Sequence, residues 1–250
     1  MPNLKSNIEW KLWGKDDPLH GVSSWTNTQK GAESEWTEED FYALGESDWQ
    51  DFVQRWQQYG LNKESCLEVG CGAGRITRQL VLFFNHVHAV DVSEAMIGYA
   101  RNRIEAGNVQ YFVVDGLSLP QKDLSVKAIF STHVLQHLDN IDIGLSQFSE
   151  FFRVLDFGGT LMVHMPLYQW PRETGKLALV FKEMYRFQNK VDDAKAYLAR
   201  RRGIKTMRGT RYPLPLLHSK LQDTGFKNIE FRIFPTLSNG ALHPFVFCTK

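Results

Sequence analysis

The segment from Cys66 to Arg75 constrains the fold of this 250-residue chain more than any other. It reads C-L-E-V-G-C-G-A-G-R, so apolar residues typical of a buried strand lead into three glycines spaced as G-x-G-x-G. Glycine permits a sharp turn and a close approach of ligand to backbone, and the free N–H groups of a helix opening at Arg75 would point toward that ligand. The segment predicts a nucleoside-cofactor site between a strand and a helix.

The spacing of the glycines indicates which cofactor to expect. A dinucleotide-binding turn reads G-x-G-x-x-G, whereas here the third glycine, Gly74, comes one residue early. Glu68 also places a carboxylate two residues before Gly70, where it would repel a pyrophosphate and attract an ammonium or sulfonium group. These residues resemble the first motif, (D/E)-x-G-x-G-x-G, of the class I, Rossmann-like S-adenosylmethionine-dependent methyltransferases. The resemblance covers roughly residues 60–167 and 213–250, and it implies S-adenosylmethionine as the cofactor.

Two further carboxylates follow the turn at suitable spacing. Asp91 ends the apolar run H-V-H-A-V-D about 20 residues later, where a carboxylate accepts both ribose hydroxyls. Asp115 ends Y-F-V-V-D, and the resemblance implies that it binds the adenine amino group while Leu117 lies against the adenine face. Taken singly, Asp91 could cap a helix and Asp115 could be a turn residue. We expect the cofactor to contact Glu68, Gly70, Cys71, Gly72, Gly74, Arg75, Asp91, Val92, Met96, Asp115, Gly116, Leu117, Thr132 and His133.

Strands and helices alternate from Ser65 onward, which predicts an α/β fold with a doubly wound, mainly parallel seven-stranded sheet and helices on both faces. The resemblance adds a C-terminal antiparallel hairpin. Before the sheet, aromatic residues at helical intervals predict a helix over 36–59 that ends at Gly60. The expected strands are 66–69, 87–91, 109–114, 127–131, 159–165, 228–234 and 244–249, with helices at 75–83, 94–105, 142–154 and 213–224 and a turn at 156–159.

Two regions outside this core should determine the substrate. We predict an N-terminal aromatic and helical cap, residues 1–59, and a methyltransferase-like domain, residues 60–250, that carries a lid insertion at about 168–212. The segment with tryptophans 10, 13, 25 and 36 is expected to fold over the cofactor, where these rings either stack on the substrate or plug an open sheet edge. The insertion contains an amphipathic piece, Leu177–Phe187, and a basic run that is either a solvated face or a clamp for a carboxylate or phosphate. That run comprises Arg200, Arg201, Arg202, Lys205, Arg208 and Arg211.

Methyl transfer from a sulfonium is an in-line displacement, and a hydroxyl acceptor must also lose a proton. His133 is the first candidate base because it follows the strand that ends near Thr132. His137 is the second; Tyr168 and His164 are weaker candidates, and His218 and His243 rank below them. Alternatively, His133 bonds only backbone near the cofactor and His137 only supports the following helix. An amine or activated carbon acceptor would need no strong base.

Composition and short motifs narrow the possible substrates, the cellular location and the possible metal sites. The net charge of +1 gives no general attraction to nucleic acid or to membranes, and the signature (D/N)-P-P-(Y/F) of nucleic-acid N-methylation is absent. Three cysteines without metal or disulfide spacing, no signal peptide and no long apolar run suggest the cytoplasm. We expect no metal site, since only Asp139 and Asp142 stand near the fourth strand; Asp139 with Asn140 more plausibly caps the next helix.

The predicted activity is methylation of a small-molecule acceptor, anionic acceptors included, at a hydroxyl or amine of a sugar, nucleotide-sugar or secondary metabolite. An RNA or protein methyltransferase, and a member of the fold that binds S-adenosylmethionine without turnover, remain as alternatives.

Overall fold

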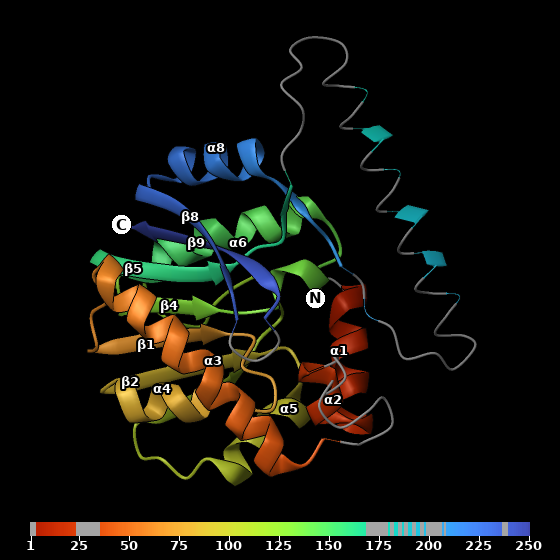
Figure 1. Ribbon diagram of the computed structural model, residues 1–250, viewed down its shortest axis with the longest axis vertical. Helices are drawn as coiled ribbons and strands as arrows, with labels where there is room; N and C mark the ends of the chain where they lie inside the picture. The colour runs from red at the N-terminus through yellow and green to blue at the C-terminus, as the bar shows by residue number, and fades with distance from the viewer. Residues whose placement is uncertain are drawn as a thin grey trace.

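A computed structural model describes residues 4–23, 36–168, 207, 209–236 and 240–250, together with scattered positions between 180 and 198. Its centre is a seven-stranded sheet in the order β3-β2-β1-β4-β5-β9-β8 (Figure 1). The first five strands of this order pair in parallel, and β9 is antiparallel to both β5 and β8. The predicted fold class is confirmed. The strands are β1 (Ser65–Val69), β2 (His86–Asp91), β3 (Val109–Val113), β4 (Val126–Ser131), β5 (Leu155–His164), β8 (Lys227–Pro235) and β9 (Leu242–Thr249).

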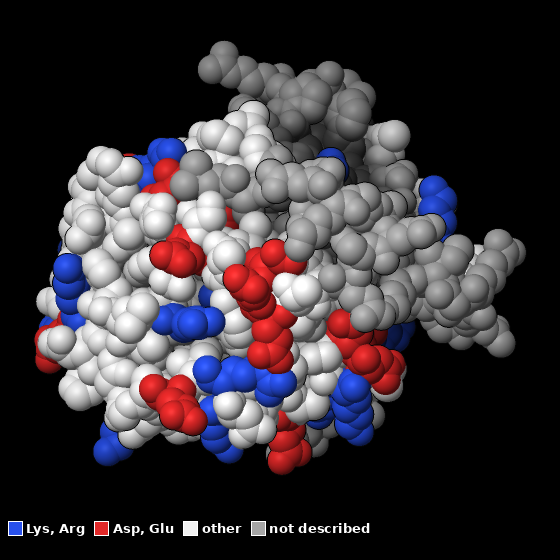
Figure 2. Space-filling view, turned by 60° about the horizontal axis from the view of Figure 1, so that its bottom comes forward, with Lys and Arg blue, Asp and Glu red and all other residues white. Residues whose placement is uncertain are grey.

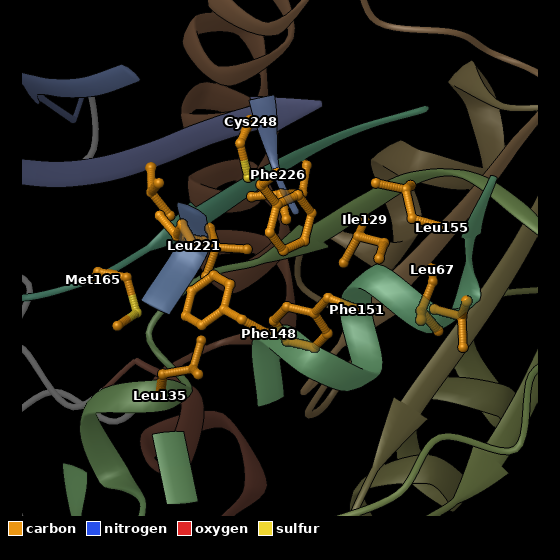
Figure 3. Close-up of a cluster of buried hydrophobic side chains, with 14 of the residues drawn as sticks. Leu67, Ile129, Leu135, Phe148, Phe151, Leu155, Met165, Leu221, Phe226 and Cys248 are labelled. Carbon is orange, nitrogen blue, oxygen red and sulfur yellow. The ribbon is translucent and has the colours of Figure 1, made fainter. Parts of the chain in front are cut away.

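Helices cover both faces of the sheet (Figure 1). On one face α3 (Glu38–Tyr59), α4 (Thr77–Phe83) and α5 (Glu94–Arg103) bury an aromatic layer that includes Trp56 and Phe130. On the other face α6 (Ile141–Val154) and α8 (Leu214–Thr224) press Phe148, Phe151 and Leu221 against the strands (Figure 3). Residues two apart in a strand share a face, so the near-continuous apolar runs of β1 and β4 supply both layers.

Several predicted boundaries agree with the structure because local chemistry sets them. Gly60 ends α3 and Gly225 ends α8, both with positive φ that favours glycine. Asn140 caps α6 by accepting a hydrogen bond from the N–H of Ile143 at 2.9 Å. The predicted turn at 156–159 is wrong: these residues form the start of β5, next to a register shift against β4.

The N-terminal segment contains two helices, α1 (Lys5–Asp16) and α2 (Pro18–Val22), whose bounds the sequence did not reveal. Their hydrophobic residues are irregularly spaced, and α1 is held by distant partners. Asp139 accepts hydrogen bonds from the N–H groups of Lys5 and Ser6 at 2.8 and 2.7 Å, so it caps α1 rather than the helix that follows it. The expectation that Asp139 and Asn140 cap the same helix is therefore corrected.

The two ends of the predicted insertion meet in a small parallel sheet of β6 (Leu167–Tyr168) and β7 (Tyr212–Pro213). Trp25, Leu177 and the basic residues 200, 201, 202, 205 and 208 lie outside the described residues. Within the described part of the chain, no helix is long and apolar enough to cross a membrane. Figure 2 shows one face on which described acidic and basic side chains are interspersed, in keeping with the small net charge.

Candidate functional site

A deep cleft opens at the carboxyl ends of β1, β2 and β4, where open α/β sheets bind ligands. It holds about 1180 Å³ of unfilled space, its open mouth included. The glycine turn after β1 forms its floor, and α1 and α2 lie along one side. The segment after β4 forms another wall, so residues far apart in the sequence enclose one chamber.

The three glycines of the turn have different structural duties. All have positive φ (78°, 54° and 86° at Gly70, Gly72 and Gly74). A Cβ at Gly72 would lie 2.6 Å from Val22 of α2, and one at Gly70 would lie 2.2 Å from the side chain of Val134, which packs directly against this glycine. Gly74 instead faces Ile104 and Ala100, so it serves the packing of α5 and does not line the cleft.

Asp91 joins this turn to the tip of β2. Its carboxylate oxygens accept hydrogen bonds from the N–H groups of Gly72 and Ser93, each at 2.9 Å. Burial raises the pKa of Asp91, while these backbone donors oppose the shift. The residue lines the cleft, and each oxygen keeps a further lone pair, so the carboxylate can still accept a ribose hydroxyl. Ser93, rather than Asp91, caps α5.

Glu68 lies in the same cleft but is almost fully buried. Its Oε2 accepts a short hydrogen bond from the hydroxyl of Thr77, at 2.6 Å. Burial is the largest cause that raises the pKa of Glu68 to about 7; the Thr77 hydrogen bond and Arg75 act in the opposite direction. Glu68 is consequently poised to lose its proton when a cation approaches.

The structure distributes the remaining predicted cofactor residues unevenly. Cys71, Val92, Gly116 and Thr132 line the cleft. Asp115 accepts hydrogen bonds from the N–H groups of Leu117 and Ser118, both at 2.8 Å, which orders the turn beside Gly116; neither Asp115 nor Leu117 lines the cleft. Met96 of α5 is wholly buried and packs against Gly14 of α1 and Gly21 of α2, so it stabilises the position of the N-terminal helices.

Arg75 was expected to open the helix after the turn. Instead α4 begins at Thr77, and the Arg75 guanidinium forms a buried ion pair with Asp48 of α3 at 2.6 Å. Arg75 also lines the cleft. The ion pair therefore anchors the glycine turn to α3, a contact across 27 positions that no local pattern could indicate.

Two of the three predicted catalytic residues line the cleft. His133 has a φ of 58°, and desolvation lowers its pKa well below the usual value, so its imidazole is neutral near pH 7. His137 lies edge-on to Trp10, with ring centroids 5.1 Å apart, and its Nε2 is 2.9 Å from the side-chain amide of Gln136. Tyr168 lies in β6, outside the lining of the cleft.

Sequence reasoning missed several cleft residues. Ser6, Asn7 and Val22 come from α1 and α2, and Asn7 donates a hydrogen bond to the carbonyl of Asp115 at 2.7 Å. Trp10, predicted from the sequence as one of the residues that could fold over the cofactor, also lines the cleft. The tryptophan content of the N-terminal segment was the available signal, because it indicated a folded segment without locating it. From the predicted insertion, Met207 lies along the cleft.

The strand order and the glycine turn define a Rossmann-like nucleoside-binding protein. A family model described as "Methyltransferase domain" matches residues 67–163. A malonyl-(acyl-carrier protein) O-methyltransferase of Bacillus cereus is 35% identical over 98 residues, which are 38% of this chain and 35% of that protein. The chain thus matches about a third of the length of this curated relative.

Solved structures share the fold over most of the chain. The magnesium protoporphyrin IX methyltransferase of Synechocystis PCC 6803, solved with bound S-adenosylmethionine, superposes with a TM-score of 0.60 at 15% identity, over 100% of this chain and 99% of that one. A methyltransferase from Aquifex aeolicus reaches 0.52 at 19% identity, over 86% and 98%. Residues 67–163 thus match a methyltransferase domain, and the chain shares its fold with solved S-adenosylmethionine-dependent methyltransferases of class I.

Proposed function

We propose that this protein transfers the methyl group of S-adenosylmethionine to an oxygen or nitrogen of a small-molecule acceptor. The observation that carries the proposal is the meeting of Gly72, Asp91 and Glu68 in one cleft. The positive φ of Gly72 lets the turn present its backbone to the cleft, Asp91 offers acceptors for the ribose hydroxyls, and Glu68 offers a negative charge to the methionine end.

The opposite wall of the cleft provides groups suited to an acceptor. Trp10 supplies an aromatic surface, Gln136 an amide and His137 a polar ring, all within the same chamber. His133 is neutral at physiological pH and has a lone pair for a proton, although its lowered pKa makes it a weaker base than an exposed histidine. This favours acceptors that lose their proton readily, such as carboxylates, or amines that are already neutral.

The related proteins support a small acceptor. The name of the curated relative refers to a malonyl group on acyl-carrier protein, which is not a nucleic acid. On the face drawn in Figure 2, the described acidic and basic side chains are interspersed and form no extended basic track for a phosphate backbone. We therefore propose a soluble small-molecule acceptor with hydroxyl, carboxylate or amine character, including sugars, nucleotide-sugars and secondary metabolites.

The test has two stages. Calorimetry with S-adenosylhomocysteine first measures cofactor binding, and one site per chain is expected. Panels of carboxylates, alcohols, amines and a short structured RNA are then incubated with S-adenosylmethionine, and formation of S-adenosylhomocysteine is measured. Turnover with a small acceptor supports the proposal. Binding without any turnover would favour a non-catalytic member of the fold, turnover on RNA alone would replace the small-molecule assignment, and no binding would reject the cofactor itself.

A further inference from the structure

Three histidines from separate strands converge at the carboxyl edge of the sheet. His133 follows β4, His164 ends β5, and His243 stands near the start of the antiparallel β9, so all three reach the same edge. His164 is almost fully buried, the other two are partly buried, and His133 also lines the cleft. None of the site residues discussed above explains why three imidazoles should meet here.

The distances within this histidine cluster fit a metal site. One ring nitrogen from each residue lies within 4.8 Å of the others, and the ring centroids are 4.3, 4.9 and 5.2 Å apart. Nδ1 of His243 is 3.3 Å from Nε2 of His164. Zinc–nitrogen bonds of about 2.0–2.1 Å in tetrahedral geometry require ligand nitrogens about 3.3–3.4 Å apart. The separation of the His164 and His243 nitrogens already matches this value.

The chemistry of the rings also suits metal binding. A metal takes the neutral imidazole, and burial lowers the pKa of His164 to about 3 and that of His133 and His243 below the usual value. Arg75 lowers the pKa of His133 and His243, and Asp48, its ion-pair partner, opposes this effect at His243. The rings are therefore held in the neutral form that a metal takes.

We propose that His133, His164 and His243 bind one divalent transition-metal ion of the kind that prefers imidazole, with zinc the best fit. Three protein ligands leave one coordination position for a further ligand. Because His133 lines the cleft, that position would be available to an oxygen of the methyl acceptor; this second statement rests on the proposed function. It also revises the expectation of no metal, which considered cysteine spacing and the carboxylates after the fourth strand but no histidine ligands.

The test uses untagged full-length protein treated with a chelator and dialysed. Zinc is added alone, and its affinity is measured by competition with a chromophoric chelator; bound metal is counted by elemental analysis. We expect one zinc per chain. Substitution of one ligand, His164→Gln or His243→Gln, should weaken binding by roughly a hundredfold or more, since loss of even an outer-shell partner costs 10–100-fold. The cobalt form should show the visible bands of a four-coordinate ion.

His218→Gln is the matched control, because His218 lies on α8 beside Phe231 and outside the histidine cluster. It should bind zinc like the wild type. Circular dichroism checks that each variant folds, and the partly buried His243 provides a second variant if His164→Gln does not fold. Less than stoichiometric zinc in the wild type, or equal affinity in the wild type and a folded His243→Gln variant, would overturn the proposal. Because zinc is the only ligand added, either result leaves cofactor binding to be judged separately.

Discussion

The carboxylate of Asp91 accepts a hydrogen bond from the N–H of Gly72 at 2.9 Å, which ties the tip of β2 to the cofactor turn after β1. The same carboxylate closes a second bond to Ser93 at the start of α5. Asp91 therefore holds the turn and presents its remaining lone pairs to the cleft. Structural support and the proposed ribose contact thus depend on one side chain.

Replacing Asp91 should separate these two duties. Asp91→Ala removes every acceptor, and we expect affinity for S-adenosylhomocysteine to fall by about one to two orders of magnitude, or about 1.4–2.7 kcal/mol. Asp91→Asn retains one acceptor oxygen and should lose less. Calorimetry measures both, with circular dichroism to confirm folding. Unchanged affinity in a folded Asp91→Ala variant would contradict the proposed ribose contact.

Glu68 should make stability depend on pH. Its folded pKa of about 7 exceeds its usual 4.5, so the folded state holds the proton more tightly than the unfolded chain. The resulting stability is fully present below about pH 4.5 and is lost as the pH rises through 7, by about 3 kcal/mol in total. Glu68→Gln should therefore be more stable than the wild type at pH 8 and show a flatter profile.

Chemical denaturation of the cofactor-free protein from pH 5 to 8 measures this difference. Glu64→Gln is the control, because Glu64 is exposed just before β1 and its substitution should leave the profile unchanged. If the stability of the wild type and that of Glu68→Gln change with pH in the same way, burial does not raise the pKa of Glu68.

Gly72→Ala should impair the turn in two ways. A φ of 54° costs a non-glycine residue about 1–2 kcal/mol, and the new methyl group would meet Val22 of α2. We expect both lower stability and weaker cofactor binding. Gly98→Ala is the matched control. Gly98 lies within α5 with open space around it, so alanine should raise the free energy of unfolding by up to about 1 kcal/mol. Equal stability of the two variants would contradict the assigned role of Gly72.

The ion pair of Arg75 and Asp48 should be important for folding. Both side chains are about 97–98% buried, so Asp48→Ala would leave an uncompensated guanidinium inside the protein. The expected loss is about 3–5 kcal/mol, measured by denaturant unfolding. The more exposed pair of Asp51 and Arg55 serves for comparison, and Asp51→Ala should cost less than about 1 kcal/mol. Similar losses for both variants would exclude a special contribution of the buried pair.

Elements that are defined by interactions between residues close in the sequence could be predicted, and elements that depend on distant residues could not. The capping glycines, Gly60 and Gly225, and the apolar runs of the strands were readable because a residue and its neighbours specify them. The helices α1 and α2 were not, since Asp139 and Met96, distant in sequence, hold them in place. Tyr168 was predicted as a candidate base because it follows a predicted strand. Tertiary packing, which no local pattern reveals, places it outside the cleft.

The sequence by itself determined the alternating fold and the glycine turn, because backbone sterics and hydrophobic periodicity act within a few residues. Only the tertiary structure decided that Arg75 pairs with Asp48 and that His133 meets His164 and His243. Strand order brings those groups together across tens of residues, and burial then sets their charge states. Neither effect leaves a local pattern in the chain.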